Sequence, residues 1–166
     1  ITTAAQFWKE YDAQAWLRGL RDQGFVRSSK QLPGGTWQLN LDNAALADLK
    51  PLTGQPISDL SLGATLITDL SPLAGLPLKS LDLKNGKVTD LTPLKDLKLD
   101  LLSLRGTKVT DLSPLRGSPL KSLWLSNCKD LTDLSPLADC QELPAITLPP
   151  LAKDFEFLRK LPKLER

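Results

Sequence analysis

The sequence predicts an α/β solenoid in which short parallel strands stack into one sheet and alternate with short helices. Two observations predict it. A core of the form Asp-hydrophobic-x-Pro-Leu recurs at steps of 21, 21, 21, 22 and 21 residues, beginning at Asp48, Asp69, Asp90, Asp111, Asp133 and, in the degenerate form "DFEFL", Asp154. A hydrophobic-x-hydrophobic triplet precedes every core by eight to ten residues, beginning at Leu39, Leu60, Leu81, Leu102, Leu123 and Ile146. Such a period is typical of stacked repeats.

Each triplet is predicted to be a short strand with two side chains on one face and the middle one on the other. No single strand of this length can bury its apolar side alone. Stacked about 4.8 Å apart in one parallel sheet, the strands bring their leucines into a continuous inner column. Burial of these leucines therefore explains the repetition.

The Asp-containing core is predicted to return the chain to the next strand. Ser71, Thr92, Ser113 and Ser135 stand where they could cap a short helix whose first position is the following proline. The leucine after that proline is expected to point into the core. With some fifteen residues available, the return path suits a short 3-10 or irregular helix.

The first forty residues do not repeat. "TAAQ" at Thr3 to Gln6 has a capping-box pattern, and the apolar residues that follow predict a helix over 4–23. We expect this helix to cover the open end of the solenoid, although its aromatic face could instead bind a ligand. "VRSSKQLPGG" is predicted to be a loop into the first strand at Trp37. The domains are thus a helical cap and loop over 1–35 and a repeat domain over 36–166.

The stretch "LKSLDLKNGKVTDLTPLKDL" resembles the leucine-rich repeat, LxxLxLxxNxL, in the short form of bacterial internalins and of the phosphatase-regulating branch. The resemblance covers about residues 36–166. It implies a right-handed solenoid with the parallel sheet on the concave face, short 3-10 helices on the convex face and non-catalytic binding of proteins. Where the family usually has Asn, this chain has Ala44, Thr65, Gly86, Thr107 and Cys128. Thr and Cys can still donate to backbone carbonyls, but Ala and Gly cannot, so we expect no continuous ladder there.

The segments "GTKVTDLSPLRGSPLKSLWL" and "ITLPPLAKDFEFLRKLPKLER" are similar in sequence pattern to repeat regions attached to serine/threonine protein kinases of planctomycete-type bacteria. That resemblance implies a sensor or docking region for a kinase. The sequence itself contains no kinase Gly-rich loop, HRD or DFG motif.

Composition argues against several function classes. Lys and Arg total 21 against 19 Asp and Glu, and a net charge of +2 gives no reason to expect nucleic acid or an anionic membrane as partner. No run approaches the roughly 20 apolar residues of a membrane helix, so we expect no direct membrane insertion. Histidine is absent, which removes the commonest general base and metal ligand. We expect no enzyme, no cofactor and no metal.

Two alternatives concern the other titratable groups. The column of aspartates could suggest calcium, but each stands before a helix start, where its oxygen can accept from free N–H groups instead. Cys128 and Cys140 are expected to pack in the core, the alternative being a disulfide or a reactive thiol. So few cysteines slightly favour the cytoplasm, or an extracytoplasmic location if the chain is attached to a membrane-anchored kinase. The chain begins at Ile1 and has no Met, from which we expect a piece of a longer protein or a processed product.

The open face of the sheet is the candidate binding surface. Trp124 stands in its strand where the neighbouring repeats have small polar residues, and Trp and Arg dominate binding hot spots. We expect the partner-binding residues to be Asp59, Asp82, Lys84, Leu101, Ser103, Arg105 and Trp124. The alternative is that Trp124 lies flat against adjacent strands or under the C-terminal tail.

The predicted function is therefore recognition of a protein or peptide by a monomeric scaffold module, which the kinase resemblance implies is the sensor or docking region of a bacterial kinase. A structural or cell-surface adhesive repeat without a dedicated partner is the alternative.

Overall fold

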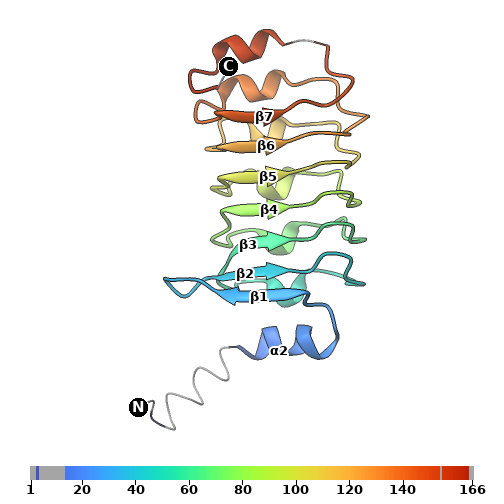
Figure 1. Ribbon diagram of the computed structural model, residues 1–166, viewed down its shortest axis with the longest axis vertical. Coiled ribbons are helices and arrows are strands. Elements are labelled where there is room, and N and C mark those ends of the chain that lie inside the picture. Colours follow the sequence, from blue (N-terminus) through green and yellow to red (C-terminus); the bar gives the residue numbers. More distant parts are fainter. Residues whose placement is uncertain (1–2, 4–13, 154, 165–166) are drawn as a thin grey trace.

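A computed structural model describes residues 3, 14–153 and 155–164 of the chain. One sheet runs along the molecule in the order β1 to β7 (Figure 1). Its strands are β1 (Ser28–Gln31), β2 (Trp37–Asn40), β3 (Ile57–Ser61), β4 (Ser80–Asp82), β5 (Leu101–Ser103), β6 (Ser122–Trp124) and β7 (Ala145–Thr147). Within the described residues, the helices are α2 (Ala15–Asp22) and six 3-10 helices: η1 (Lys50–Leu52), η2 (Ser71–Leu73), η3 (Thr92–Leu94), η4 (Ser113–Leu115), η5 (Ser135–Asp139) and η6 (Glu156–Lys160).

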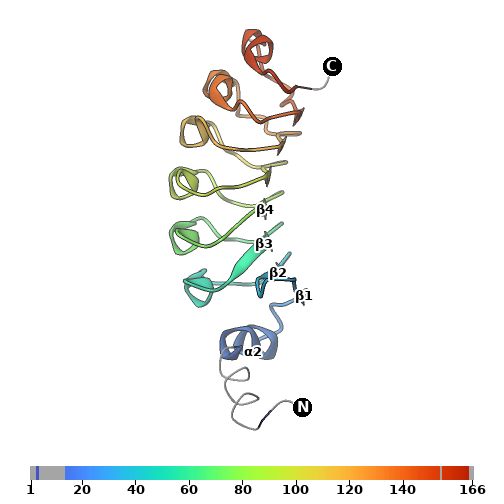
Figure 2. The same cartoon turned by 90° about the vertical axis from the view of Figure 1, so that its left-hand side faces the viewer.

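Strands β2 to β7 pair in parallel, each with the next along the chain. Equivalent residues of successive repeats face one another, so Leu81 pairs with Leu60 on one side and with Leu102 on the other. The sheet lies on the concave side of a gentle curve and the 3-10 helices lie on the convex side (Figure 2). The predicted repeat architecture is confirmed.

The core is the column of leucines between these two layers. Leu81, Leu102 and Leu123 from the middle of the strands are fully buried, and so are Leu73 and Leu137 from the 3-10 helices. Burying a leucine side chain contributes about 1.5–3 kcal/mol relative to leaving it exposed. At the last strand the column weakens, because Ile146 is only half-buried.

The aspartates of the repeated core begin each return turn. The Oδ1 atom of each accepts the backbone N–H two residues further on at 2.7–2.9 Å, as in Asp48 with Lys50, Asp69 with Ser71, Asp90 with Thr92, Asp111 with Ser113 and Asp133 with Ser135. The predicted Ser and Thr caps are wrong. In η2 to η5 these residues are the first of the 3-10 helix, and the preceding leucine occupies the cap position without a side-chain hydrogen bond. The short carboxylate reaches the N–H group from a position in the turn, as in an Asx turn.

These contacts also stabilise the charged form of the aspartates. Donation from the Ser71, Thr92 and Ser113 hydroxyls, and then from their backbone N–H groups, lowers the pKa of Asp69, Asp90 and Asp111. At Asp133 the backbone N–H of Ser135 contributes most to the lowered pKa. The aspartates of this column therefore accept hydrogen bonds from the backbone of their own repeats. Asp154, in the sixth copy, lies outside the described residues.

The N-terminal end differs from the prediction. Residues 28–31, expected in a loop, form β1, which pairs antiparallel with β2. Two glycines with positive φ, Gly34 at 95° and Gly35 at 85°, allow the tight turn between the two strands, closed by a 2.8 Å bond from Leu32 N to Thr36 O. The polar sequence "SSKQ" has no alternation of apolar residues that could predict a strand. β1 pairs with β2 through its backbone and places no buried side chain in the core.

Helix α2 lies below this hairpin and closes the end of the solenoid (Figure 2). Its Leu17 and Leu20 are buried, and Trp16 packs edge-on against Trp37 with ring centroids 6.4 Å apart. This confirms a helix over Ala15–Asp22 and its packing on the core. Residues 4–13 of the predicted helix, including Gln6 of the capping box, lie outside the described residues.

At the position where the family has Asn, side-chain hydrogen bonds to backbone carbonyls form in some repeats and not in others, as expected. Thr65 and Thr107 donate to backbone carbonyls of their own repeats at 2.8 and 2.7 Å. Cys128 instead donates to the carbonyl of Leu104 in the preceding repeat at 3.0 Å. Cys128 and Cys140 are both free and fully buried, and burial raises the pKa of both thiols. Packing in the core is thus confirmed for both. Among the described residues, no helix is long and apolar enough to cross a membrane.

We expect Leu102→Ala to lower the free energy of unfolding by about 2–5 kcal/mol, because it leaves a cavity in the continuous column. Leu66→Ala is the matched control: that side chain is 70% exposed, so its loss should change the free energy by less than about 0.5 kcal/mol. Urea unfolding followed by circular dichroism measures both. Equal effects would contradict the role of the column.

Acid should destabilise the fold through the aspartate column. The pKa of Asp69, Asp90, Asp111 and Asp133 is lower in the folded chain, so their stabilisation is present above the unfolded value of about 4. It is lost as pH falls through the folded pKa. We expect Tm to drop below about pH 4, and to drop less in Asp90→Asn, whose amide oxygen still accepts the N–H but does not titrate. Asp96→Asn, outside the column, should keep the parent's dependence. If Tm falls as far at low pH in Asp90→Asn as in the parent, protonation of Asp90 is not a cause of the acid destabilisation.

Candidate functional site: the concave face of the sheet

Parallel register sorts the concave face into two rows. Asp59, Ser80, Leu101 and Ser122 are partners across β3 to β6, and Ser61, Asp82, Ser103 and Trp124 form the second row. The leucines between these rows point into the core. The strands therefore bring Asp59, Asp82, Leu101, Ser103 and Trp124 onto one surface, as the sequence predicted.

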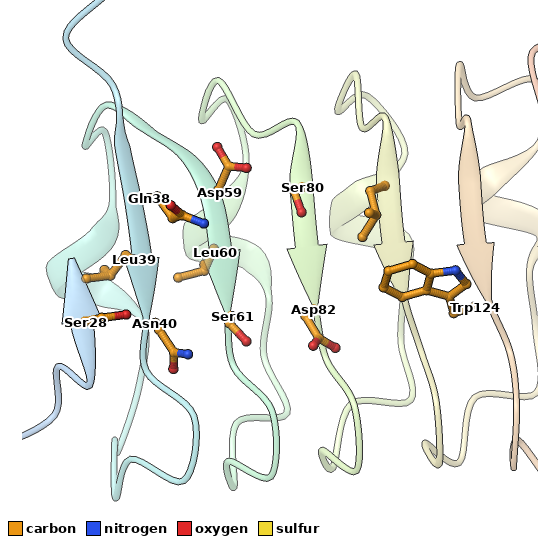
Figure 3. Close-up of a pocket in the computed structure, with 11 residues that line it drawn as sticks. Ser28, Gln38, Leu39, Asn40, Asp59, Leu60, Ser61, Ser80, Asp82 and Trp124 are labelled. Atoms are coloured by element: carbon orange, nitrogen blue, oxygen red, sulfur yellow. The ribbon is translucent and has the colours of Figure 1, made fainter. Parts of the chain in front are cut away.

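Trp124 extends its indole from β6 over the neighbouring strand β5 (Figure 3). Its side chain is half-buried, and the guanidinium carbon of Arg105 lies 4.8 Å from the ring centroid. At this distance the cation is attracted to the ring, by about 0.5–1 kcal/mol at an exposed site. The ring thus lies against the adjacent strand, the alternative weighed from the sequence, but it keeps accessible surface beside an exposed Arg105.

Ser103 does not offer surface to a partner. Its side chain is on the strand that the indole crosses, it is 0% exposed, and its Oγ has no hydrogen-bond partner among the described residues. A buried hydroxyl without a partner costs about 1–3 kcal/mol. The expectation that Ser103 contacts a partner therefore needs correction, since access would require the indole of Trp124 to move away.

Lys84 is held by two carboxylates from different repeats. Its Nζ lies 2.9 Å from Asp42 Oδ2 and 3.4 Å from Asp82 Oδ2. To reach Asp42, the side chain passes over Gly63, where a Cβ atom would come within 2.8 Å of Lys84 Cε. A Cβ atom at position 63 would therefore displace the Lys84 side chain from this path.

Hydrogen bonds fix the Asp42 end of this bridge. The Ser61 hydroxyl and the Gly63 N–H donate to its Oδ1 at 2.5 and 2.7 Å. Burial works to raise the pKa of Asp42, but the bonds from Ser61, Lys84 and Gly63 outweigh it and leave the pKa below its ordinary value. The hydrogen bond to Asp42 raises the pKa of Lys84 in turn. Lys84 therefore stays charged, and in this structure its ammonium pairs with carboxylates of the same chain.

A shallow hollow of about 290 Å³ lies along the N-terminal side of this face (Figure 3). Its lining comes from strands β1 to β6: Ser28, Gln38, Leu39, Asn40, Asp59, Leu60, Ser61, Ser80, Asp82, Leu101 and Trp124. Four predicted site residues thus meet at one hollow, while Lys84, Ser103 and Arg105 lie outside its lining. Sequence reasoning missed the wall that β1 provides, which the turn signal "LPGG" before Trp37 could have indicated.

Two solved structures from Listeria monocytogenes resemble this geometry. The crystal structure of an internalin, inlF, matches 74% of this chain at 31% identity with a TM-score of 0.66. That of internalin C2 matches 78% at 26% identity with a TM-score of 0.60. By structural similarity to these two internalins, the chain is an internalin-like leucine-rich repeat protein. It covers 37% of the inlF structure's length and 77% of that of internalin C2.

Internalin-like leucine-rich repeat domains are typically protein-interaction modules and are generally non-catalytic. The chain matches no protein-family model and no curated protein sequence. The resemblance therefore rests on the repeat geometry and on the two solved structures.

We expect Ser103→Ala in this internalin-like domain to raise the free energy of unfolding by about 1 kcal/mol, because it removes a buried hydroxyl that lacks a partner. Ser80→Ala, in the other row and half-exposed, should change it by less than about 0.5 kcal/mol. Chemical denaturation measures both. A clear loss of stability in Ser103→Ala would show that the hydroxyl is bonded in the folded protein.

Proposed function

We propose that this internalin-like domain is a recognition module that binds a protein or peptide across its concave face. The observation that carries the proposal is the half-buried Trp124, held by Arg105 at the side of a hollow in an otherwise small and polar row. The proposed contact residues are Asp59, Asp82, Lys84, Leu101, Arg105 and Trp124, with Ser103 beneath the indole.

Rigidity supports this role. The side chains of the face are fixed on strands whose backbones are paired on both sides, so binding orders little of the domain. Tryptophan and arginine supply large contact areas, and residues of these types carry most of the energy in many interfaces. Six parallel strands span about 24 Å along the stack, a length that suits a peptide or part of a domain.

Attachment to a serine/threonine kinase would make the domain a sensor or docking region. The comparisons with known proteins give no link to a kinase, and the proposal does not depend on one. A structural or adhesive repeat without a dedicated partner is distinguished by experiment, since it would use no particular residue of the face.

We expect Trp124→Ala to weaken peptide binding about tenfold or more, because it removes the largest accessible aromatic of the face. Peptides are selected from a displayed library on the immobilised domain, and their Kd is measured by calorimetry. Trp124→Phe should retain part of the affinity. Lys95→Ala, exposed at the end of η3 on the convex side, should retain all of it.

A photo-crosslinker at position 124, compared with one at position 95, tests the same surface in a native lysate. Capture from 95 and not from 124 would place recognition on the convex side. Unchanged Kd values in Trp124→Ala, with its fold verified by circular dichroism, would contradict the proposed site and favour the adhesive alternative.

A further inference from the structure

We infer that the hollow beside Trp124 receives a lysine or arginine side chain from an extended peptide. The inference rests on the proposed function and names the chemistry of its partner. The charge in the hollow points to it: Asp59 and Asp82 line the hollow, and the lining contains no basic residue.

Asp59 is the carboxylate without a charge partner. Its Oδ2 accepts the Ser58 hydroxyl at 2.6 Å, and that hydroxyl also lies 3.2 Å from Thr36 Oγ1, which fixes the orientation of the carboxylate. No Lys or Arg pairs with Asp59 among the residues that the structure describes. A half-buried carboxylate held in place by a neutral donor is therefore available to a cation from outside.

Lys84 does not neutralise the hollow. It is closer to Asp42 than to Asp82, at 2.9 against 3.4 Å, and among the described residues it forms no ion pair with Asp59. Arg105 carries a positive charge, but it lies against the Trp124 ring and outside the lining.

The opposite side of the hollow is apolar. Leu101 on β5 and Trp124 on β6 lie across from Asp59 on β3, with two strand spacings, or about 10 Å, between β3 and β5. Lysine and arginine bury their long stems on apolar surface while the charged head reaches polar groups. A basic side chain therefore fits with its stem on Leu101 and Trp124 and its head at Asp59. Arg105 repels that head from the far end, which sets the direction of the side chain.

Size and ligand number favour a peptide side chain over a metal ion. A volume of about 290 Å³ is at the lower limit of small-molecule sites, and it suits one long side chain. Calcium takes six to eight oxygen ligands, whereas the described part of the chain holds no group of three metal-ligating acidic, Cys or His residues. The neutral Gln38, Asn40 and Ser80 in the lining can bond the backbone of a peptide that runs across the strands.

The test uses two displayed peptide libraries that are identical except that one lacks Lys and Arg. We expect binders that depend on Trp124 to come from the complete library. Replacing the critical lysine of a binder by norleucine, which keeps the stem and removes the charge, should weaken binding about tenfold. Asp59→Asn should cause a similar loss, and the two changes together should cost little more than either alone. Asp96→Asn, on the convex side, is the matched charge control.

The outcomes separate this inference from the proposed function. Peptides that require Trp124 but bind without a basic residue, and bind equally well to Asp59→Asn, would overturn the inference and leave the recognition role intact. Binding that does not depend on Trp124 would overturn the proposed function itself. Trp124-dependent capture of neutral oligosaccharides from a glycan array, in the absence of peptide binders, would overturn the inference in favour of a sugar ligand.

Discussion

The parallel register of the leucine column is the constraint on which the rest of the structure depends. Each inward leucine of one strand pairs with its equivalent in the next, so a shift of one residue would turn the leucines toward water. The 21-residue spacing keeps this register from β2 to β6, because these repeats have the same length of chain for their return turns. The one longer step, between Asp111 and Asp133, places its extra residue after β6, in the loop around Cys128, and the pairing of β6 with β7 stays in register.

This constraint separates folding from recognition. The inward leucines and the aspartate turns determine the backbone, whereas the outward residues of the strands contribute little to the core. Side chains on the concave face can therefore differ from repeat to repeat without disturbing the fold, as the series Ser61, Asp82, Ser103 and Trp124 illustrates. A scaffold of this kind supports a surface whose chemistry is set almost independently of its shape.

Periodicity was sufficient to predict the strands, the core leucines and the rows of the concave face. Periodicity could not predict structural features that do not recur from repeat to repeat. The β1 hairpin has no repeated counterpart, and its polar strand carries no apolar pattern. The burial of Ser103 depends on the rotamer of Trp124 in the next repeat, which residue spacing does not specify. The turn aspartates accept backbone N–H groups as the sequence predicted, whereas the predicted Ser and Thr caps do not form, because these residues are the first of the 3-10 helices.

The bridge from Lys84 to Asp42 skips one repeat, because it joins residues 42 positions apart and passes over Gly63. A side chain at that glycine would displace the lysine, so residues of three repeats meet at this point. Flattening or tightening the arc over β2 to β4 would alter the gap that the lysine spans. The bridge therefore opposes bending of the arc at the acidic end of the hollow, beside the strands that carry Asp59 and Asp82.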